Sequence, residues 1–212
     1  TYEHVKTTYP FTDVIRFYNN ADGGWASFVP TQNLVDMFEM ENGKTIDEPG
    51  SGYDPVHPFA NRDPRLKNTI IYPGMDWIGR NDIPRIINTL DKTLPDGTAN
   101  NDYYTAADNA SHTGLLWAKY LRPNQSQYST SMNDDGLCPI IFRYAEILLT
   151  KAECLVELNQ DLQEALNIVD RLRIRGGHIA LDRSKYATQA QVREIVRKER
   201  TIELAGEGFR YE

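Results

Sequence analysis

The chain has 212 residues, of which 40% are hydrophobic and 25% are charged, and its formal net charge is −7. This composition is ordinary for a globular protein and excludes a disordered or collagen-like chain. The sequence has no block of consecutive basic residues that would bind nucleic acid. It also has no apolar run of the roughly 20 residues that a membrane helix needs. The negative net charge favours a neutral ligand.

The first region, residues 1–137, is rich in Pro, Gly, Asn, Asp and Tyr, and its periodic stretches are short. A helix is predicted after Pro30, with Thr31 as its cap. Short extended segments are expected at residues 14–18, 66–72 and 114–120. Because the loops between them are long, and long loops in compact domains usually carry function, we expect this region to hold the ligand surface.

The second region, residues 138–212, has helical periodicity. The first helix is predicted from apolar residues at alternating steps of four and three: Ile141, Ala145, Leu148, Ala152 and Leu155. A second helix is predicted from the cap at Asp161 to the stop at Gly176–Gly177. A third is predicted to start at Thr188, where Gln191 completes a capping box.

The first two of these helices resemble a tetratricopeptide repeat, because alanines stand at the expected close-contact positions, Ala152 and Ala165. One such repeat cannot bury its own faces, so further helices are expected elsewhere. Because the chain starts at Thr1 without a signal core and stops at Glu212 within a patterned segment, we interpret it as a single unit that is truncated at both ends.

The third helix carries carboxylates at four-residue steps, Glu199, Glu203 and Glu207, with arginines interleaved. A carboxylate pair for glycoside hydrolysis and a metal site are alternative interpretations. Side chains on one helix face cannot surround a substrate, however, and neighbouring arginines would neutralise them. We favour a structural network of salt bridges between helices, with Arg143 or Arg171 as a partner.

No cofactor or catalytic centre is predicted from the sequence. The four histidines lack metal-ligand spacing, and phosphate-binding and serine-nucleophile motifs are absent from the sequence. Asp22 and Asp134–Asp135 lie in loops rich in Asn and Gly that could hold a structural calcium ion, although their spacing does not fit an EF-hand. We expect no catalytic residues and no metal ligands.

The tryptophans are the strongest candidates for ligand contact. Trp77 follows an expected strand, and Trp25 follows a loop of similar polar composition. An indole stacks on the apolar face of a sugar while nearby polar groups bind its hydroxyls, although each tryptophan could instead be a packing residue. Replacing a loop tryptophan by alanine is expected to cost little stability but much affinity. The predicted ligand-binding residues are Trp25, Tyr72, Asp76, Trp77, Arg80 and Asn81.

Four segments in order and spacing resemble the SusD/RagB family of outer-membrane nutrient-binding lipoproteins of Bacteroidetes. They are PTQNLVDMF at 30–38, NRDPRL at 61–66, RYAEILL at 143–149 followed by KAE at 151–153, and RKER at 197–200 followed by ELAGEGFR at 203–210. The resemblance implies a mainly α fold, a SusD-like α/α superhelix of tetratricopeptide-like helix pairs with a loop-rich region that contains short strands.

The same resemblance implies a binding protein rather than an enzyme. It implies capture of neutral oligosaccharides or polysaccharides, surface exposure at the outer membrane through an N-terminal lipid anchor, and a TonB-dependent, SusC-like transporter as partner. Capture of oligopeptides by the same architecture is an alternative, and a glycoside hydrolase is a further one.

Overall fold

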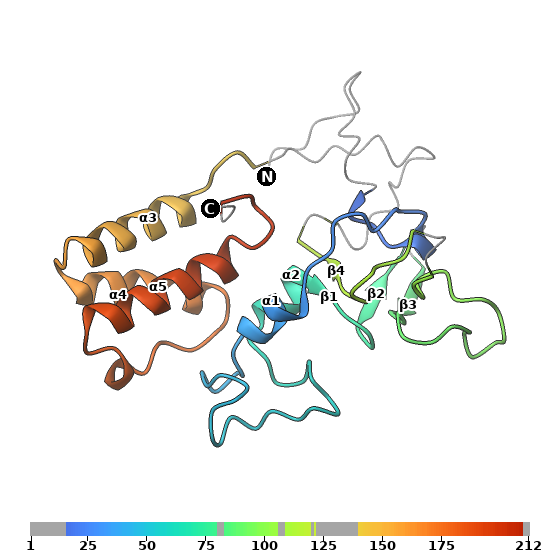
Figure 1. The fold of residues 1–212 in the computed structure, drawn as a ribbon, viewed down its shortest axis with the longest axis horizontal. Helices are drawn as coiled ribbons and strands as arrows, with labels where there is room; N and C mark the ends of the chain where they lie inside the picture. The colour runs from blue at the N-terminus through green and yellow to red at the C-terminus, as the bar shows by residue number, and fades with distance from the viewer. Residues whose placement is uncertain (1–15, 80–82, 106–108, 120, 122–139, 210–212) are drawn as a thin grey trace. The chain divides into compact units, whose positions relative to one another are not determined.

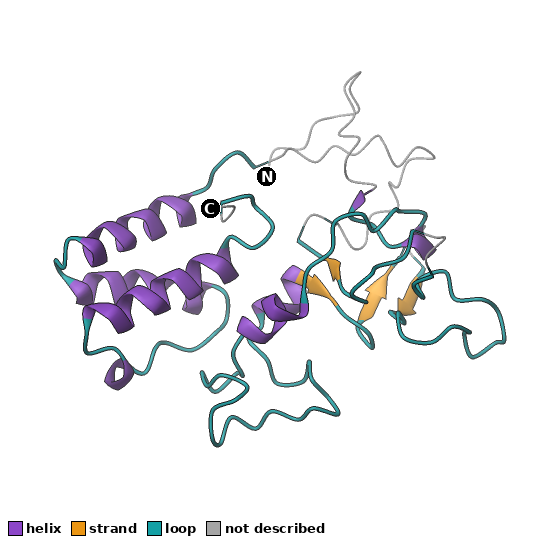
Figure 2. Ribbon diagram, viewed as in Figure 1, coloured by secondary structure: helices purple, strands orange, loops and turns teal. Residues whose placement is uncertain are grey.

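The computed structural model describes residues 16–79, 83–105, 109–119, 121 and 140–209 (Figure 1). The chain forms two compact units: unit 1 contains residues 1–32 and 67–139, and unit 2 contains residues 33–66 and 140–212. Helices make up most of the regular structure and the strands are short, which confirms the predicted fold class (Figure 2). Within the described ranges, every helix is too short or too polar to cross a bilayer.

Unit 2 is built on three helices that pack on one another (Figure 1). They are α3 (Tyr144–Glu157), α4 (Leu162–Arg175) and α5 (Gln189–Glu203), with a short 3-10 helix η4 (Arg183–Lys185) between the last two. Ala152 of α3 and Ala165 of α4 are both fully buried, so small side chains allow the two helices to approach closely. The apolar cluster that the helices enclose includes Leu148, Leu149, Leu166, Val169, Val192 and Val196.

The predicted helix ends are confirmed. The Asp161 carboxylate accepts a hydrogen bond from the Glu164 amide at 3.1 Å, which satisfies one of the free N–H groups at the start of α4. Thr188 and Gln191 form both halves of a capping box at the start of α5. After α4, Gly177 adopts the left-handed conformation at φ 84°.

One predicted helical residue lies outside its helix. Ile141 was expected on the apolar face of α3, but it precedes the helix and is 82% exposed. The reason is that Arg143 is the residue before the first turn, with an extended backbone at φ −143° and ψ 164°. Its guanidinium binds Glu203 at 2.6 Å and Glu207 at 2.7 Å, which fixes where the helix can begin.

Residues 33–66 belong to unit 2, although they lie within the range 1–137 that is expected to be the loop-rich region. This segment contains most of α1 (Gln32–Met37). A guanidinium nitrogen of Arg62 donates to the carbonyl of Val35 at 2.7 Å and to that of Phe38 at 2.8 Å. A cation there satisfies carbonyls that a helix end leaves without intrahelical partners.

A buried arginine joins this segment to α5. The Arg65 guanidinium binds Asp63 at 2.7 Å and Glu199 at 2.5 Å, and all three side chains are buried. Burial opposes the charge of Arg65, but the carboxylates of Glu199 and Asp63 outweigh it and raise the Arg65 pKa above its ordinary value. The site has no room to spare, since a Cβ at Gly176 would lie 2.4 Å from the Arg65 Cδ.

Glu39 holds a second buried cluster in unit 2. Its carboxylate binds Arg173 at 2.7 Å, Lys198 at 2.8 Å and the Nε2 atom of His178 at 3.2 Å. Burial favours the neutral acid, but the hydrogen bond with His178 and the charges of Lys198 and Arg173 outweigh it. The Glu39 pKa therefore lies far below its ordinary value.

The network predicted on Glu199, Glu203 and Glu207 is confirmed, with Arg143 as a partner of the last two. Arg65 is a partner that the sequence did not indicate.

The described residues of unit 1 form two small antiparallel sheets. Strand β1 (Ile70–Ile71) pairs with β4 (Leu116–Trp117), and β2 (Asp76–Ile78) pairs with β3 (Pro84–Ile86). The strands expected at 66–72 and 114–120 are thus confirmed only in part, because helix α2 (Arg65–Thr69) occupies the start of the first one. Residues 16–18 of the segment expected at 14–18 are not a strand, and a short 3-10 helix η2 (Asn20–Asp22) follows them. The core of unit 1 includes Tyr18, Ile71, Trp77, Ile87 and Leu116.

Replacing Leu166 by alanine should lower the free energy of unfolding by about 2–5 kcal/mol, because the side chain is fully buried among α3, α4 and α5. Urea unfolding followed by circular dichroism measures this. The matched control is Leu158→Ala, which removes an exposed leucine and should change stability by less than about 0.5 kcal/mol. Equal effects of the two substitutions would contradict the packing described here.

Replacing Glu39 by glutamine should lower stability at pH 7 by about 3–5 kcal/mol, because it leaves buried cations without their carboxylate. A carboxylate with a depressed pKa stabilises the fold at neutral pH, and this contribution is lost as pH falls below its ordinary pKa of 4.5. In urea titrations the difference between variant and wild type should therefore stay constant from pH 7 to about pH 5 and shrink as the pH falls below 4.5. Glu48→Gln, at the more exposed pair with Lys185, should have a much smaller effect at either pH.

Candidate functional site

Unit 1 contains a cavity of about 830 Å³ beside the β2–β3 pair. Its volume lies within the roughly 300–1,000 Å³ of typical ligand pockets. The polar residues that line it are Lys67, Asn68, Asp76, Arg85 and Lys119. The apolar residues that line it are Met75, Trp77, Ile78, Pro84, Ile86, Ala118 and Leu121. The wall therefore combines apolar surface with a few charged and amide groups, which is the usual make-up of a small-molecule site.

The pairing of β2 with β3 sets which side chains meet at the cavity. Asp76 stands directly opposite Ile86, and Trp77 stands opposite Arg85. Asp76 and Ile86 are both exposed, whereas the Trp77 side chain is only 4% exposed and belongs to the core of unit 1. The indole is thus a fixed part of the cavity wall rather than an open stacking surface.

A buried polar network holds this wall in place. The Trp77 Nε1–H donates to the Asp22 carboxylate at 3.2 Å, and Arg85 donates to the same carboxylate oxygen at 3.1 Å. Arg85 also binds Asp102 at 2.9 Å, and Asp102 accepts from the Asn19 side-chain amide at 2.9 Å. Both aspartates are buried, and these hydrogen bonds satisfy carboxylate oxygens that would otherwise lack partners.

The backbone around Asp22 is adapted to the network. A Cβ at Gly79 would lie 2.6 Å from the Asp22 Oδ1 atom, so only glycine lets the end of β2 pass so close to the carboxylate. Gly23, directly after η2, is in the left-handed region at φ 86°. These two glycines let the loop turn back and present the carboxylate to the indole and the guanidinium.

Of the calcium candidates, Asp22 uses its carboxylate on Trp77 and Arg85, while Asp134 and Asp135 lie outside the described residues. Within the described ranges, no group of three or more His, Cys, Asp or Glu side chains is arranged to hold a metal ion.

The predicted ligand-binding residues are placed as follows. Asp76 and Trp77 come together at the cavity, whereas Tyr72 and Trp25 are not among the described residues that line it. Tyr72 is half-buried, and burial raises the pKa of its phenol. Trp25 is 44% exposed. Arg80 and Asn81 lie outside the described residues. Ligand binding by all six stays a prediction.

Sequence reasoning did not find Lys67, Arg85, Ile86 or Lys119 as lining residues of this cavity. All four lie outside the segment 72–81 from which the Trp77 site was predicted, and Arg85 and Ile86 are brought beside it by the pairing of β3 with β2. The expectation that a loop tryptophan can be removed at little cost in stability is wrong for Trp77, because the ring is buried.

The sequence profile of the SusD family matches residues 2–212. The chain belongs to the SusD family. The resemblance that the four sequence segments indicated is thereby confirmed.

Solved structures of SusD-like proteins share the fold. A SusD-like carbohydrate binding protein from Bacteroides fragilis is 32% identical, with a TM-score of 0.74, and the match covers 99% of this chain and 39% of that protein. A second SusD-like protein from Bacteroides fragilis is 27% identical, with a TM-score of 0.66, and the match covers 95% of this chain and 37% of that one.

A sequence relative, SusD-like protein P38 of Formosa agariphila, is 32% identical over 113 residues, which are 50% of this chain and 21% of that protein. The chain therefore spans well under half the length of the SusD-like proteins that it matches.

Replacing Asp22 by asparagine should lower the free energy of unfolding by about 1–3 kcal/mol, because the partly buried Arg85 guanidinium loses one of the two carboxylates that it binds. Thermal unfolding measures the effect. Asp91→Asn is the control, since Asp91 is exposed and accepts a hydrogen bond from the nearby Asn88 side chain. An Asp22→Asn protein as stable as wild type would contradict the role assigned to the network.

Proposed function

We propose that this chain is part of a cell-surface protein that captures oligosaccharides or polysaccharides without cleaving them. The observation that carries the proposal is the cavity of unit 1, whose wall places apolar side chains beside polar ones. A sugar ring has apolar C–H faces and a rim of hydroxyls, so it matches a wall of this kind. The SusD-like relative from Bacteroides fragilis that is described as carbohydrate binding supports the same ligand class.

The charges at the cavity support binding rather than hydrolysis. Glycoside hydrolases use two carboxyl groups on either side of the scissile bond, about 5–9.5 Å apart. Among the described residues that line the cavity, Asp76 is the one carboxylate. The nearby carboxylates of Asp22 and Asp102 are buried and bound to Arg85, so they are not available as an acid and a base.

Delivery of the ligand to a TonB-dependent, SusC-like transporter is part of the proposal, as are exposure at the outer membrane and an N-terminal lipid anchor. These features rest on membership of the SusD family. A neutral glycan is the expected ligand because the chain carries a net charge of −7. Oligopeptide capture by the same architecture is the alternative.

Wild-type protein should be retarded in native gels that contain a neutral polysaccharide from a panel, and Asp76→Ala and Ile86→Ala should each weaken that retardation. Both side chains are exposed, face each other across β2 and β3, and line the cavity, so their removal should reduce affinity while leaving the fold intact. Leu90→Ala is the matched control, because Leu90 is an equally exposed apolar residue of unit 1 that is not among the lining residues.

Unretarded migration of the wild type in gels with every glycan would contradict the proposal. Retention by columns of immobilised peptide alone would favour oligopeptide capture. Chromatography of glycans incubated with the protein separates capture from cleavage, since released sugars would identify a hydrolase.

A further inference from the structure

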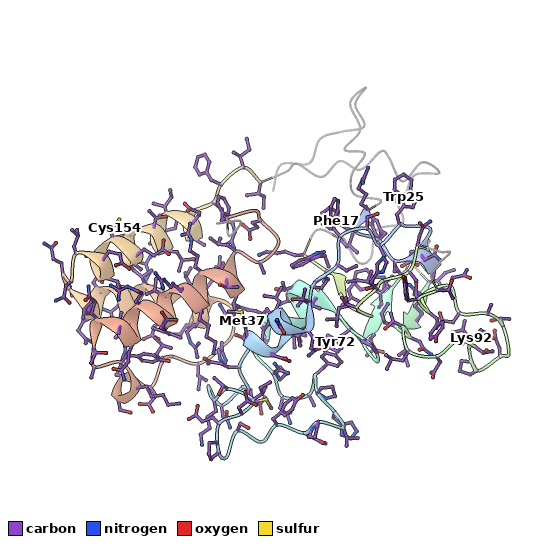
Figure 3. The ribbon with its side chains drawn as sticks, viewed as in Figure 1. Phe17, Trp25, Met37, Tyr72, Lys92 and Cys154 are labelled. Atoms are coloured by element: carbon purple, nitrogen blue, oxygen red, sulfur yellow. The ribbon has the colours of Figure 1, made fainter. Side chains whose placement is uncertain are left out.

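Unit 2 contains a cavity of its own, with a volume of about 560 Å³. This volume also lies within the roughly 300–1,000 Å³ of typical ligand pockets. Met37, the last residue of α1 and labelled in Figure 3, lines the cavity together with one face of α5. The α5 residues that line it are Ala190, Gln191, Glu194, Ile195 and Lys198. The described residues that line the unit 1 cavity are all different ones.

A loop that is held by its own hydrogen bonds forms the facing wall. Gly43, Thr45 and Glu48 of this loop line the cavity. The Met40 amide donates to the Lys44 carbonyl at 2.8 Å, and the Glu48 amide donates to the Thr45 carbonyl at 3.1 Å. The Lys44 ammonium donates to the carbonyl of residue 49 at 2.8 Å. The wall is thus formed before any ligand arrives, which lowers the entropy cost of binding.

The charges on the cavity wall are already paired. Each lining carboxylate has a cationic nitrogen nearby, and the pairs are Glu39–Lys198 at 2.8 Å, Glu48–Lys185 at 2.6 Å and Glu194–Arg197 at 3.4 Å. Binding is favoured when the charges of a ligand complement those of its site. A neutral ligand therefore suits this wall better than an ion does.

Neutral polar groups of the wall are available to a ligand. Among the described residues, none hydrogen-bonds to the side-chain hydroxyl of Tyr186 or Thr45, which both line the cavity. Burial and the nearby Glu39 carboxylate raise the pKa of Tyr186 to about 12, so its hydroxyl stays protonated and can donate. The Gln191 side-chain oxygen accepts from the Thr188 amide at 3.0 Å, which leaves the NH₂ group of Gln191 as a donor.

The Glu48–Lys185 pair adds a donor beside an acceptor. Lys185 donates to one oxygen of Glu48, while an ammonium has three N–H groups and a carboxylate has a second oxygen. The hydrogen bond from Lys185 lowers the pKa of Glu48, so this carboxylate is charged at neutral pH. Two neighbouring hydroxyls of a sugar match the pair, because one can donate to the carboxylate while the other accepts from the ammonium.

A peptide fits the cavity less well than a sugar does. Extended peptides commonly bind by adding a strand to the edge of a sheet. The described part of unit 2 has no strand that could offer such an edge. The apolar side chains that line the cavity, Met37, Ala190 and Ile195, can instead contact the C–H groups of a sugar ring.

We propose that the unit 2 cavity is a second binding site, which takes a neutral sugar either as a free molecule or as one unit of a glycan. In this site the Glu48–Lys185 pair binds two neighbouring hydroxyls, and Tyr186 donates to a third oxygen. The inference goes beyond the proposed function, because it concerns a separate cavity in the other unit.

Backbone-amide NMR of the ¹⁵N-labelled chain, titrated with the methyl glycosides of glucose, galactose, mannose and xylose, tests the inference. Amide shifts should change at residues 43–48 and 185–198 with at least one glycoside. Glu48→Gln should weaken the affinity measured from these shifts about tenfold, the effect of losing one hydrogen bond to a charged group. Tyr186→Phe should also weaken it while keeping the ring that packs against the core of unit 2.

Glu157→Gln is the matched control and should bind like the wild type. Glu157 forms a similar ion pair in unit 2, with Arg193 at 2.7 Å, but it is not among the described residues that line the cavity. Titration with the corresponding hexasaccharides separates the two sources of the sugar. Shifts with the methyl glycosides assign a site for the free sugar, and shifts with hexasaccharides alone assign a site for a unit within a chain.

The inference is overturned if no sugar changes the amide shifts of unit 2, or if Glu48→Gln and Tyr186→Phe both bind like the wild type. Changes in unit 2 with the neutral peptide N-acetyl-trialanine amide, and with no sugar, would also overturn it. Shifts confined to the unit 1 cavity leave the proposed function standing without this inference. Shifts confined to unit 2 support this inference and count against the unit 1 cavity as a glycan site.

Discussion

Unit 2 depends on burying an arginine between two carboxylates. Arg65 could not be accommodated among α4 and α5 without Asp63 and Glu199, because an unpartnered buried charge would cost several kcal/mol. The Arg65–Glu199 ion pair joins residues that are 134 positions apart in the sequence. The Glu39–Arg173 ion pair joins two residues over the same separation. Because these ion pairs join residues 33–66 to the helices, moving the segment away from them would leave buried charges unpaired.

The four segments that resemble the SusD family supply many of these charges and their partners. The segment 30–38 supplies the carbonyls that Arg62 of the segment 61–66 binds. Arg65 of the same segment binds Glu199 of α5. The segment 143–149 begins with Arg143, which binds Glu203. The last segment supplies Glu199, Glu203 and Glu207. In this chain the four segments therefore carry many of the buried ion pairs of unit 2, and none of the described residues that line the cavity of unit 1 lies in them.

Unit 1 uses the same chemistry on a smaller scale. Arg85 lies between the buried Asp22 and Asp102, and this network positions the indole of Trp77 in the cavity wall. Since the strands are only two or three residues long, their own ladders could not hold the wall rigidly. Side-chain hydrogen bonds from loops replace a larger sheet, and the exposed residues between them are left to meet a ligand.

What the sequence determined by itself was local. The caps at Asp161 and Thr188 and the stop at Gly177 could be predicted because each depends on contacts within one helical turn. Tertiary structure alone decided that Trp77 is buried while Trp25 is exposed. It also decided that Arg65 and Arg85 bind buried carboxylates. The meeting of Asp76 and Ile86 at the cavity of unit 1 likewise depends on strand pairing. Burial and charge pairing depend on partners that are tens of residues away, as the hydrogen bond between Trp77 and Asp22 shows. A local sequence pattern does not encode which distant side chain will be the partner.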